Sequence, residues 1–128
     1  MPDLGLRKNV MGPQPIAERA ATPPETLEAA NRFLRALASG NPQEIRALTV
    51  KKAHDEVHRL AQAAHETGTY KQSRIVASAR TNRHYWIKAE LTGTGKPFIV
   101  QLRLGEQDGR WKVWETMNLT NARSAWTR

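Results

Sequence analysis

The chain has 128 residues, of which 39% are hydrophobic and 25% charged, a composition typical of one globular domain. It contains no cysteine, which excludes disulfides, thiol catalysis and cysteine-ligated zinc. The formal net charge is +8, and no apolar run reaches the roughly 20 residues of a membrane-spanning helix, so we expect no membrane span.

The positive charge belongs to the second half of the sequence. Residues 69–128 hold eleven basic and four acidic side chains, a net charge of +7, whereas residues 22–68 hold six of each. A field of this sign favours polyanions and acidic partners, so an electrostatic partner is expected on the second half.

The first 21 residues are interpreted as a flexible, proline-rich tail, because five of the seven prolines lie in the first 24 residues. They contain no apolar core of secretory type. The chain is therefore expected to be cytoplasmic, or the mature part of an exported or cell-envelope protein.

Two helical stretches follow the tail. Thr22-Pro-Pro-Glu25 predicts a helix start, with Thr22 as the cap and Glu25 completing a capping box, and Gly40 predicts the end. Asn41-Pro42-Gln43-Glu44 repeats the start signal. The second stretch is expected to reach about Glu66, with a break near residues 49–50.

After Gly68 the hydrophobic period changes to two, which predicts four strands over residues 71–79, 84–92, 97–104 and 110–119. Tight turns between them, with a strong hairpin signal at residues 107–109, indicate an antiparallel sheet. The fold class is therefore α+β, with helices packed on a sheet of four or more strands over residues 22–120. Residues 121–128 are a short basic C-terminal tail.

Strict alternation along the strands assigns each side chain to one of two faces. The face beneath the helices is expected to carry Ile75, Ala77, Ala79, Tyr85, Ile87, Ala89, Leu91, Phe98, Val100, Leu102, Leu104, Trp111, Val113 and Met117. The open face is expected to carry Arg74, Trp86, Lys88, Gln101, Arg103, Lys112, Trp114 and Thr116.

The order of these elements resembles the nuclear-transport-factor-2-like superfamily, the cystatin-like α+β cone. The resemblance is carried by AANRFLRAL and SGNPQEI, at residues 29–37 and 39–45, and by LRLGEQDGRWKVW at residues 102–114. It implies a curved sheet, a central pocket between helices and sheet, and frequent dimers through the open sheet face. It does not imply one function, since members include isomerases, dehydratases, epoxide hydrolases and non-catalytic domains. No catalytic motif of the family matches here.

Glu115 and Tyr85 are the candidate catalytic pair. Alternation places both on the core face, where a buried carboxylate could act as general acid or base and a tyrosine could donate to it. An alternative interpretation is that a bulge or a shift of one residue turns Glu115 to solvent, where it pairs with a nearby Arg or Lys.

The histidines are weak candidates for a metal site. His54 and His58 are four residues apart on the second helical stretch, a spacing that can chelate a divalent ion. No carboxylate ligand accompanies them, and the row, which includes His65, flanks the apolar stripe. A partly exposed histidine row is the favoured interpretation, so no metal and no cofactor are expected.

The open face is the candidate binding surface. Its basic and aromatic side chains are typical of protein interfaces and could also stack bases and hold phosphates. The binding residues predicted there are Arg74, Trp86, Lys88, Arg103, Lys112 and Trp114. A homodimer or protein interface is favoured over nucleic acid, for which no motif of known spacing is present.

Three functions remain open from the sequence. The first is a non-catalytic binding domain that associates with a protein partner or itself through the open face, or holds a small apolar ligand in the cone. The second is an isomerase, dehydratase or hydrolase that uses Glu115 and Tyr85. The third is a nucleic-acid accessory protein.

Overall fold

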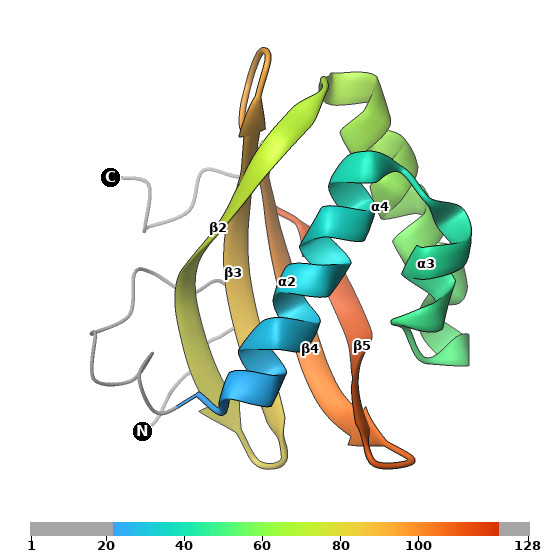
Figure 1. Cartoon of the computed structure of the whole chain (residues 1–128), viewed down its shortest axis with the longest axis vertical. Coiled ribbons are helices and arrows are strands. Elements are labelled where there is room, and N and C mark those ends of the chain that lie inside the picture. The colour runs from blue at the N-terminus through green and yellow to red at the C-terminus, as the bar shows by residue number, and fades with distance from the viewer. Residues whose placement is uncertain (1–21, 121–128) are drawn as a thin grey trace.

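The computed structural model describes residues 22–120, in which three α-helices and a short 3₁₀ helix precede four strands (Figure 1). The elements are α2 (Pro24–Ser39), α3 (Pro42–Ala47), η1 (Lys51–Ala53), α4 (His54–Thr67), β2 (Tyr70–Thr81), β3 (His84–Gly93), β4 (Phe98–Gln107) and β5 (Arg110–Asn118). This order confirms the predicted α+β class and the break in the second helical stretch. None of the helices in the described part is long and apolar enough to cross a membrane.

The helix starts follow the sequence signals only in part. Asn41 caps α3 as predicted, because its Oδ1 accepts hydrogen bonds from the amides of Gln43 and Glu44. The predicted cap at Thr22 is wrong. Its Oγ1 instead lies 2.9 Å from Oγ of Ser78, across on β2, so this hydroxyl ties the start of α2 to the sheet.

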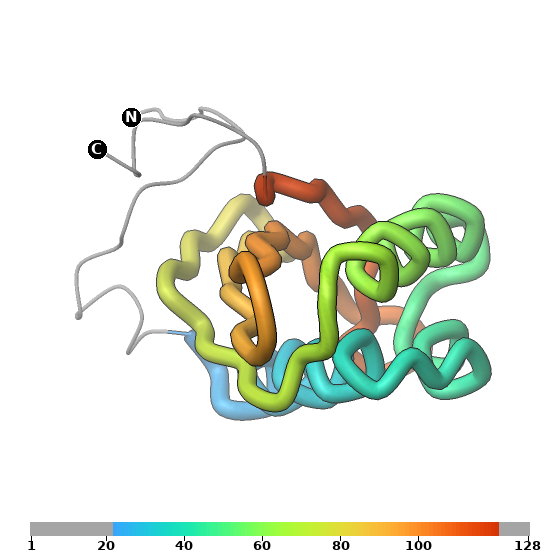
Figure 2. Tube along the Cα trace, turned by 90° about the horizontal axis from the view of Figure 1, so that it is seen from above, coloured from blue at the N-terminus to red at the C-terminus, as the bar shows by residue number. Residues whose placement is uncertain are grey.

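The sheet is antiparallel throughout, with the strand order β2-β3-β4-β5. The β4–β5 hairpin turns through Asp108 and Gly109, both with positive φ, as the sequence signal predicts. Seen from above, the strands follow a curve, and α2 and α4 lie on one side of it (Figure 2). We call the side that faces the helices the inner face and the opposite side the outer face.

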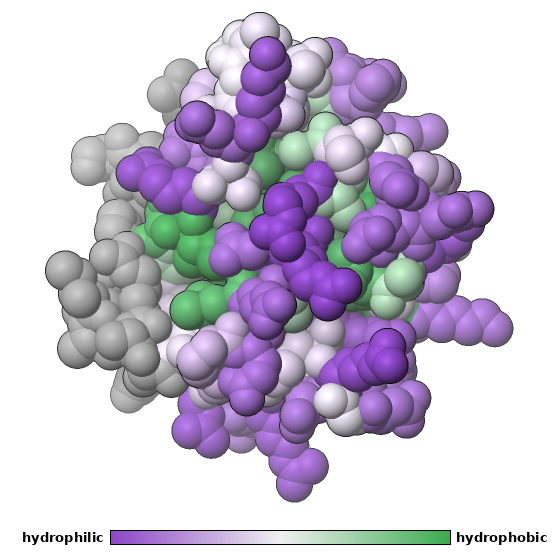
Figure 3. All heavy atoms as spheres, in the orientation of Figure 1, coloured by the Kyte–Doolittle hydropathy of each residue, from purple (hydrophilic) through white to green (hydrophobic). Residues whose placement is uncertain are grey.

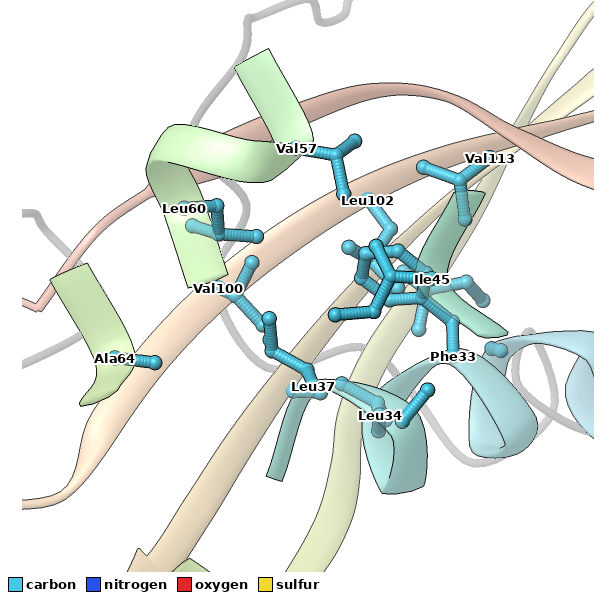
Figure 4. Close-up of a cluster of buried hydrophobic side chains, with 14 of the residues drawn as sticks. Phe33, Leu34, Leu37, Ile45, Val57, Leu60, Ala64, Val100, Leu102 and Val113 are labelled. Atoms are coloured by element: carbon cyan, nitrogen blue, oxygen red, sulfur yellow. The ribbon is translucent and has the colours of Figure 1, made fainter. Parts of the chain in front are cut away.

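The core fills the space between the inner face and the helices. Side chains from α2, α3, α4, β4 and β5 point toward one another there (Figure 4). Fully buried members include Phe33, Leu34, Ile87, Leu102 and Leu104, each with no exposed surface. On the side that carries α2, hydrophilic side chains cover most of the surface, with apolar ones showing between them (Figure 3).

Alternation is correct for β3 and β4 but fails in parts of both edge strands. Between Ile75 and Ala77 the pairing with β3 shifts by one residue, so Ala77 and Ala79 lie opposite Lys88 and Trp86 on the outer face. Their predicted place on the core face is therefore wrong, and Ser78 takes the inner position opposite Ile87. The reason is a β-bulge, whose extra residue reverses every side chain after it.

A bulge at Trp114 does the same to β5. Beyond it, Glu115 lies opposite Arg103 and Met117 opposite Gln101, both on the outer face, whereas Thr116 turns inward. The sequence predicted the reverse for all three. The inward Thr116 then meets α4, because its amide and its hydroxyl both donate to Oε2 of Glu56.

The free edge of β5 is covered by the segment between α3 and α4. Thr49 forms a parallel bridge with Val113, in which the Val113 amide donates to Leu48 and the Val113 carbonyl accepts from Val50. These bonds satisfy backbone groups that an edge strand would otherwise present to a second chain. They also bring η1, and with it Lys52, beside Trp114.

Candidate functional site

The outer face of the sheet carries the candidate site. No helix of residues 22–120 lies on this face, in contrast to the inner face (Figure 2). Trp86, Arg103 and Glu115 occupy neighbouring strands there, since Trp86 lies opposite Arg103 and Arg103 opposite Glu115. All three are half-buried, which is unusual for side chains that simply face water.

Arg103 is the centre of the site. Its Nε donates to Oε1 of Glu115 at 2.9 Å, and its Nη1 donates to Nδ1 of His84. The guanidinium carbon lies 5.9 Å from the centroid of the Trp86 ring. Because a guanidinium can only donate, Nδ1 of His84 accepts, and the imidazole proton is on Nε2. Three neighbours therefore hold Arg103 in one orientation.

Trp114 extends the site toward the edge of the sheet. Its ring centroid lies 5.2 Å from the ring centroid of His84 and 5.1 Å from Nζ of Lys52. Gly105 makes this possible. A Cβ at position 105 would lie 2.5 Å from Nε2 of His84 and 2.9 Å from Nε1 of Trp114, so only glycine leaves room for both rings.

Two titratable groups on this face have lowered pKa values. Burial is the main cause of the lowered pKa of His84, and the positive charges of Arg103 and Lys52 add to it. Burial lowers the pKa of Lys88 to about 8. The Lys88 side chain has no exposed surface and lies between Ala77 and Gln101, which makes the middle of this face unexpectedly close-packed.

The other predicted binding residues lie at the ends of the face. Arg74 pairs with Glu90 at 2.9 Å, and its side chain is 73% exposed, so this pair is a weakly stabilising surface contact. Lys112 lies opposite Gly105, next to Trp114 along β5. Neither contacts Arg103 through a hydrogen bond or ion pair.

The predicted catalytic pair is not brought together. Tyr85 lies on the inner face as expected, where its ring meets Trp111 edge to face with centroids 5.8 Å apart. Glu115 lies on the outer face with Arg103, because of the bulge at Trp114. The sheet itself therefore separates the two side chains, which matches the alternative in which Glu115 pairs with an arginine.

The histidine row lies on α4, away from the outer face. Nε2 of His54 is 3.3 Å from the carbonyl oxygen of Thr49, and His58 and His65 are exposed. Within residues 22–120, no three His, Asp or Glu side chains are grouped closely enough to hold a metal ion.

A separate open groove of about 780 Å³ lies between α2, α3 and the β4–β5 hairpin. Trp111 and Leu48 supply apolar surface to it, and its other side chains are of mixed charge. The residues that line it are Glu25, Glu28, Ala29, Arg32, Glu44, Ala47, Leu48, Glu106, Gly109, Arg110, Trp111 and Lys112. Glu115 is not among them.

Solved structures with the same arrangement decide the fold. A protein of unknown function from Silicibacter pomeroyi DSS-3, described as NTF-2-like, is 12% identical, with a TM-score of 0.54 over 82% of this chain and 99% of that one. The chain has the nuclear-transport-factor-2-like fold. A ketosteroid isomerase-like protein from Erwinia carotovora atroseptica SCRI1043 matches the domain at 15% identity, with a TM-score of 0.54 over 74% of this chain and 94% of the other.

A third solved structure, of an NTF2-like protein from Cytophaga hutchinsonii ATCC 33406, is 9% identical, with a TM-score of 0.53 over 72% of this chain and 92% of that one. At such identities the likeness concerns the fold and does not transfer an activity. No family model matches the sequence, and a search of curated proteins finds no match.

Three residues of the site were not predicted from the sequence. His84 lies two residues before Trp86 on a strand with period two, so alternation alone could have placed it on the outer face. Gly105 had a weaker signal, a glycine inside a strand, which often marks a close approach. Lys52 had none, because η1 meets Trp114 only through the tertiary fold.

Proposed function

We propose that this chain is a non-catalytic binding domain that associates with a protein partner, or with a second copy of itself, through the outer face of its sheet. One observation carries the proposal. Trp86, Arg103, Glu115 and Trp114 form a connected, half-buried array on a sheet face that no described helix covers. Tryptophan and arginine are the side chains that contribute most at protein interfaces.

The held orientation of Arg103 supports this role. Fixing a long side chain on binding costs about 0.5 to 1.5 kcal/mol of conformational entropy. Here Glu115 and Trp86 already hold the guanidinium in the free chain, so much of that cost is removed before a partner arrives. An interface with ordered side chains at its centre binds more tightly for the same buried area.

The enzyme alternative has weaker support. Glu115 accepts from Arg103 on one face while Tyr85 lies against Trp111 on the other, so the two cannot act on one substrate without a change of register. The inner space where the resemblance implied a pocket is filled by fully buried side chains such as Phe33 and Leu102. An apolar ligand there would have to displace them.

The first test is the molar mass in solution, by size-exclusion chromatography with light scattering, at low and high salt. Ala79→Arg places a long side chain opposite Trp86 on the outer face, and Ala47→Arg adds the same group to exposed α3 as a control. If the chain dimerises through the outer face, only Ala79→Arg reduces the mass to that of a monomer.

A dimer that survives Ala79→Arg, with unchanged unfolding of the variant, would contradict an interface on the outer face. A wild-type monomer at all concentrations would remove the self-association branch. The proposal would then depend on a different protein as partner.

A further inference from the structure

The end of the outer face nearest β5 forms a compact patch with an excess of positive charge. We call it the bulge patch, because it surrounds the β-bulge at Trp114. It consists of Lys52, His84, Arg103, Lys112, Trp114 and Glu115. Three bases and one acid leave a net charge of +2 when His84 is neutral, concentrated within neighbouring strands and η1.

Part of this charge is not neutralised inside the described chain. Within residues 22–120, neither Lys52 nor Lys112 forms an ion pair. Nε and Nη1 of Arg103 are engaged by Glu115 and His84, which leaves Nη2 without a hydrogen-bond partner among these residues. The patch therefore holds three nitrogen groups able to donate to an incoming anion, and Arg103 presents its donor in a fixed direction.

The aromatic rings in the patch and beside it favour a protein carboxylate over a nucleic acid. Stacking of bases needs an open ring face. Here the Lys52 ammonium and the His84 ring lie at Trp114, and the Arg103 guanidinium lies over Trp86.

We propose that the bulge patch binds an acidic segment of the partner protein, with separate carboxylates donated to by Lys52, Lys112 and Nη2 of Arg103. This inference rests on the proposed function, because it names the class of partner for the same face. It follows from charge complementarity, and it places the contact on the β5 half of the face rather than on the half with Ala79 and Trp86.

The experiment measures binding of fluorescein-labelled poly-L-glutamate of about 15 residues by fluorescence anisotropy, beside a single-stranded oligonucleotide of equal length. The full chain is compared with Lys52→Glu/Lys112→Glu. The control is Arg35→Glu/Lys71→Glu, which changes the net charge by the same amount at exposed sites on α2 and β2. Unfolding in urea checks that all three are folded.

We expect the peptide to bind at low salt and the patch variant to weaken its affinity about tenfold or more, with a change of less than about threefold in the control. Equal losses in both double variants would overturn the inference, since binding would then follow net charge alone. Tighter, patch-dependent binding of the oligonucleotide would also overturn it, in favour of a nucleic-acid surface.

Failure of this inference can be told apart from failure of the proposed function. If poly-L-glutamate does not bind but Ala79→Arg dissociates a dimer, the outer face is a self-association surface and the acidic partner is wrong. If Ala79→Arg does not change the molar mass while the peptide binds in a patch-dependent way, an acidic partner is supported. The interface is then smaller than the whole outer face.

Discussion

The two faces of the sheet are built from the same four strands, yet they are stabilised in different ways. On the inner face, Ile87 and Leu102 are fully buried beneath the helices as part of one apolar core. Their outer-face neighbours Trp86, Lys88 and Arg103 are buried or half-buried without being part of that core. The outer face is therefore an organised surface, held by polar and aromatic contacts, and differs from a sheet face whose side chains simply point into solvent.

The two faces should differ most in the unfolding free energy that is lost when one of their side chains is truncated. Leu102→Ala removes a fully buried inner side chain and should cost about 3 kcal/mol of unfolding free energy, since a cavity remains. Met117→Ala, on the outer face, should cost about 1 kcal/mol or less. Urea denaturation measures both. Equal losses would mean that the outer face is packed as tightly as the core.

Lys88→Met keeps the apolar stem and removes the buried ammonium, so the variant should lose the pH dependence of stability that this group produces. The exposed Lys71→Met is the control and should keep it. Urea denaturation at several pH values measures the difference.

The sign of this pH dependence follows from the pKa of Lys88, which is lowered from 10.5 to about 8. Between these values the unfolded chain binds more protons than the folded one, so wild-type stability rises with pH across this window. The rise should be smaller in Lys88→Met, and an equal rise in both proteins would contradict the lowered pKa.

A smaller effect should appear at the bulge patch. Gly105→Ala forces the rings of His84 and Trp114 apart and should cost about 1 kcal/mol, with shifted NMR signals of the Trp114 indole N–H and the His84 ring. Gly109→Ala meets no atom within 4 Å but has a φ of +78°, so it should cost a similar amount through backbone strain. Unchanged patch signals in both variants would mean that Gly105 does not position the rings.

The smallest change predicted here is an electrostatic shift in the pKa of His84. His84 should titrate below its ordinary pKa of 6.5, because of burial and of the charges of Arg103 and Lys52. Glu115 and Lys112 also face this part of the patch. Lys52→Gln should raise the pKa of His84 toward its ordinary value, whereas Lys51→Gln should not, as followed by NMR titration of the ring.

The lowered pKa of His84 also has a consequence for stability. The folded domain favours the neutral imidazole, so this contribution is fully present above pH 6.5 and is lost as the pH falls through the lowered pKa.

Prediction from sequence was accurate where neighbouring strands pair without interruption. β3 and β4 contain no bulge, so the period of two placed Tyr85, Trp86, Leu102 and Arg103 on their correct faces. It failed at Ala77, Ala79 and Glu115, which lie beyond a bulge in an edge strand. One extra residue reverses a strand, and whether it is accommodated depends on the partner strand, which local sequence does not contain.

Local sequence was sufficient to predict the order of helices and strands, the break between α3 and α4 and the Asp108-Gly109 hairpin. These depend on local periodicity, capping and turn geometry, which act over a few residues. Three features follow from the three-dimensional fold alone: Lys52 lies over the Trp114 ring, Arg103 lies between His84 and Glu115, and Glu115 is separated from Tyr85. Such contacts join residues far apart in the chain, and their positions follow from how the sheet curves and bulges against the helices.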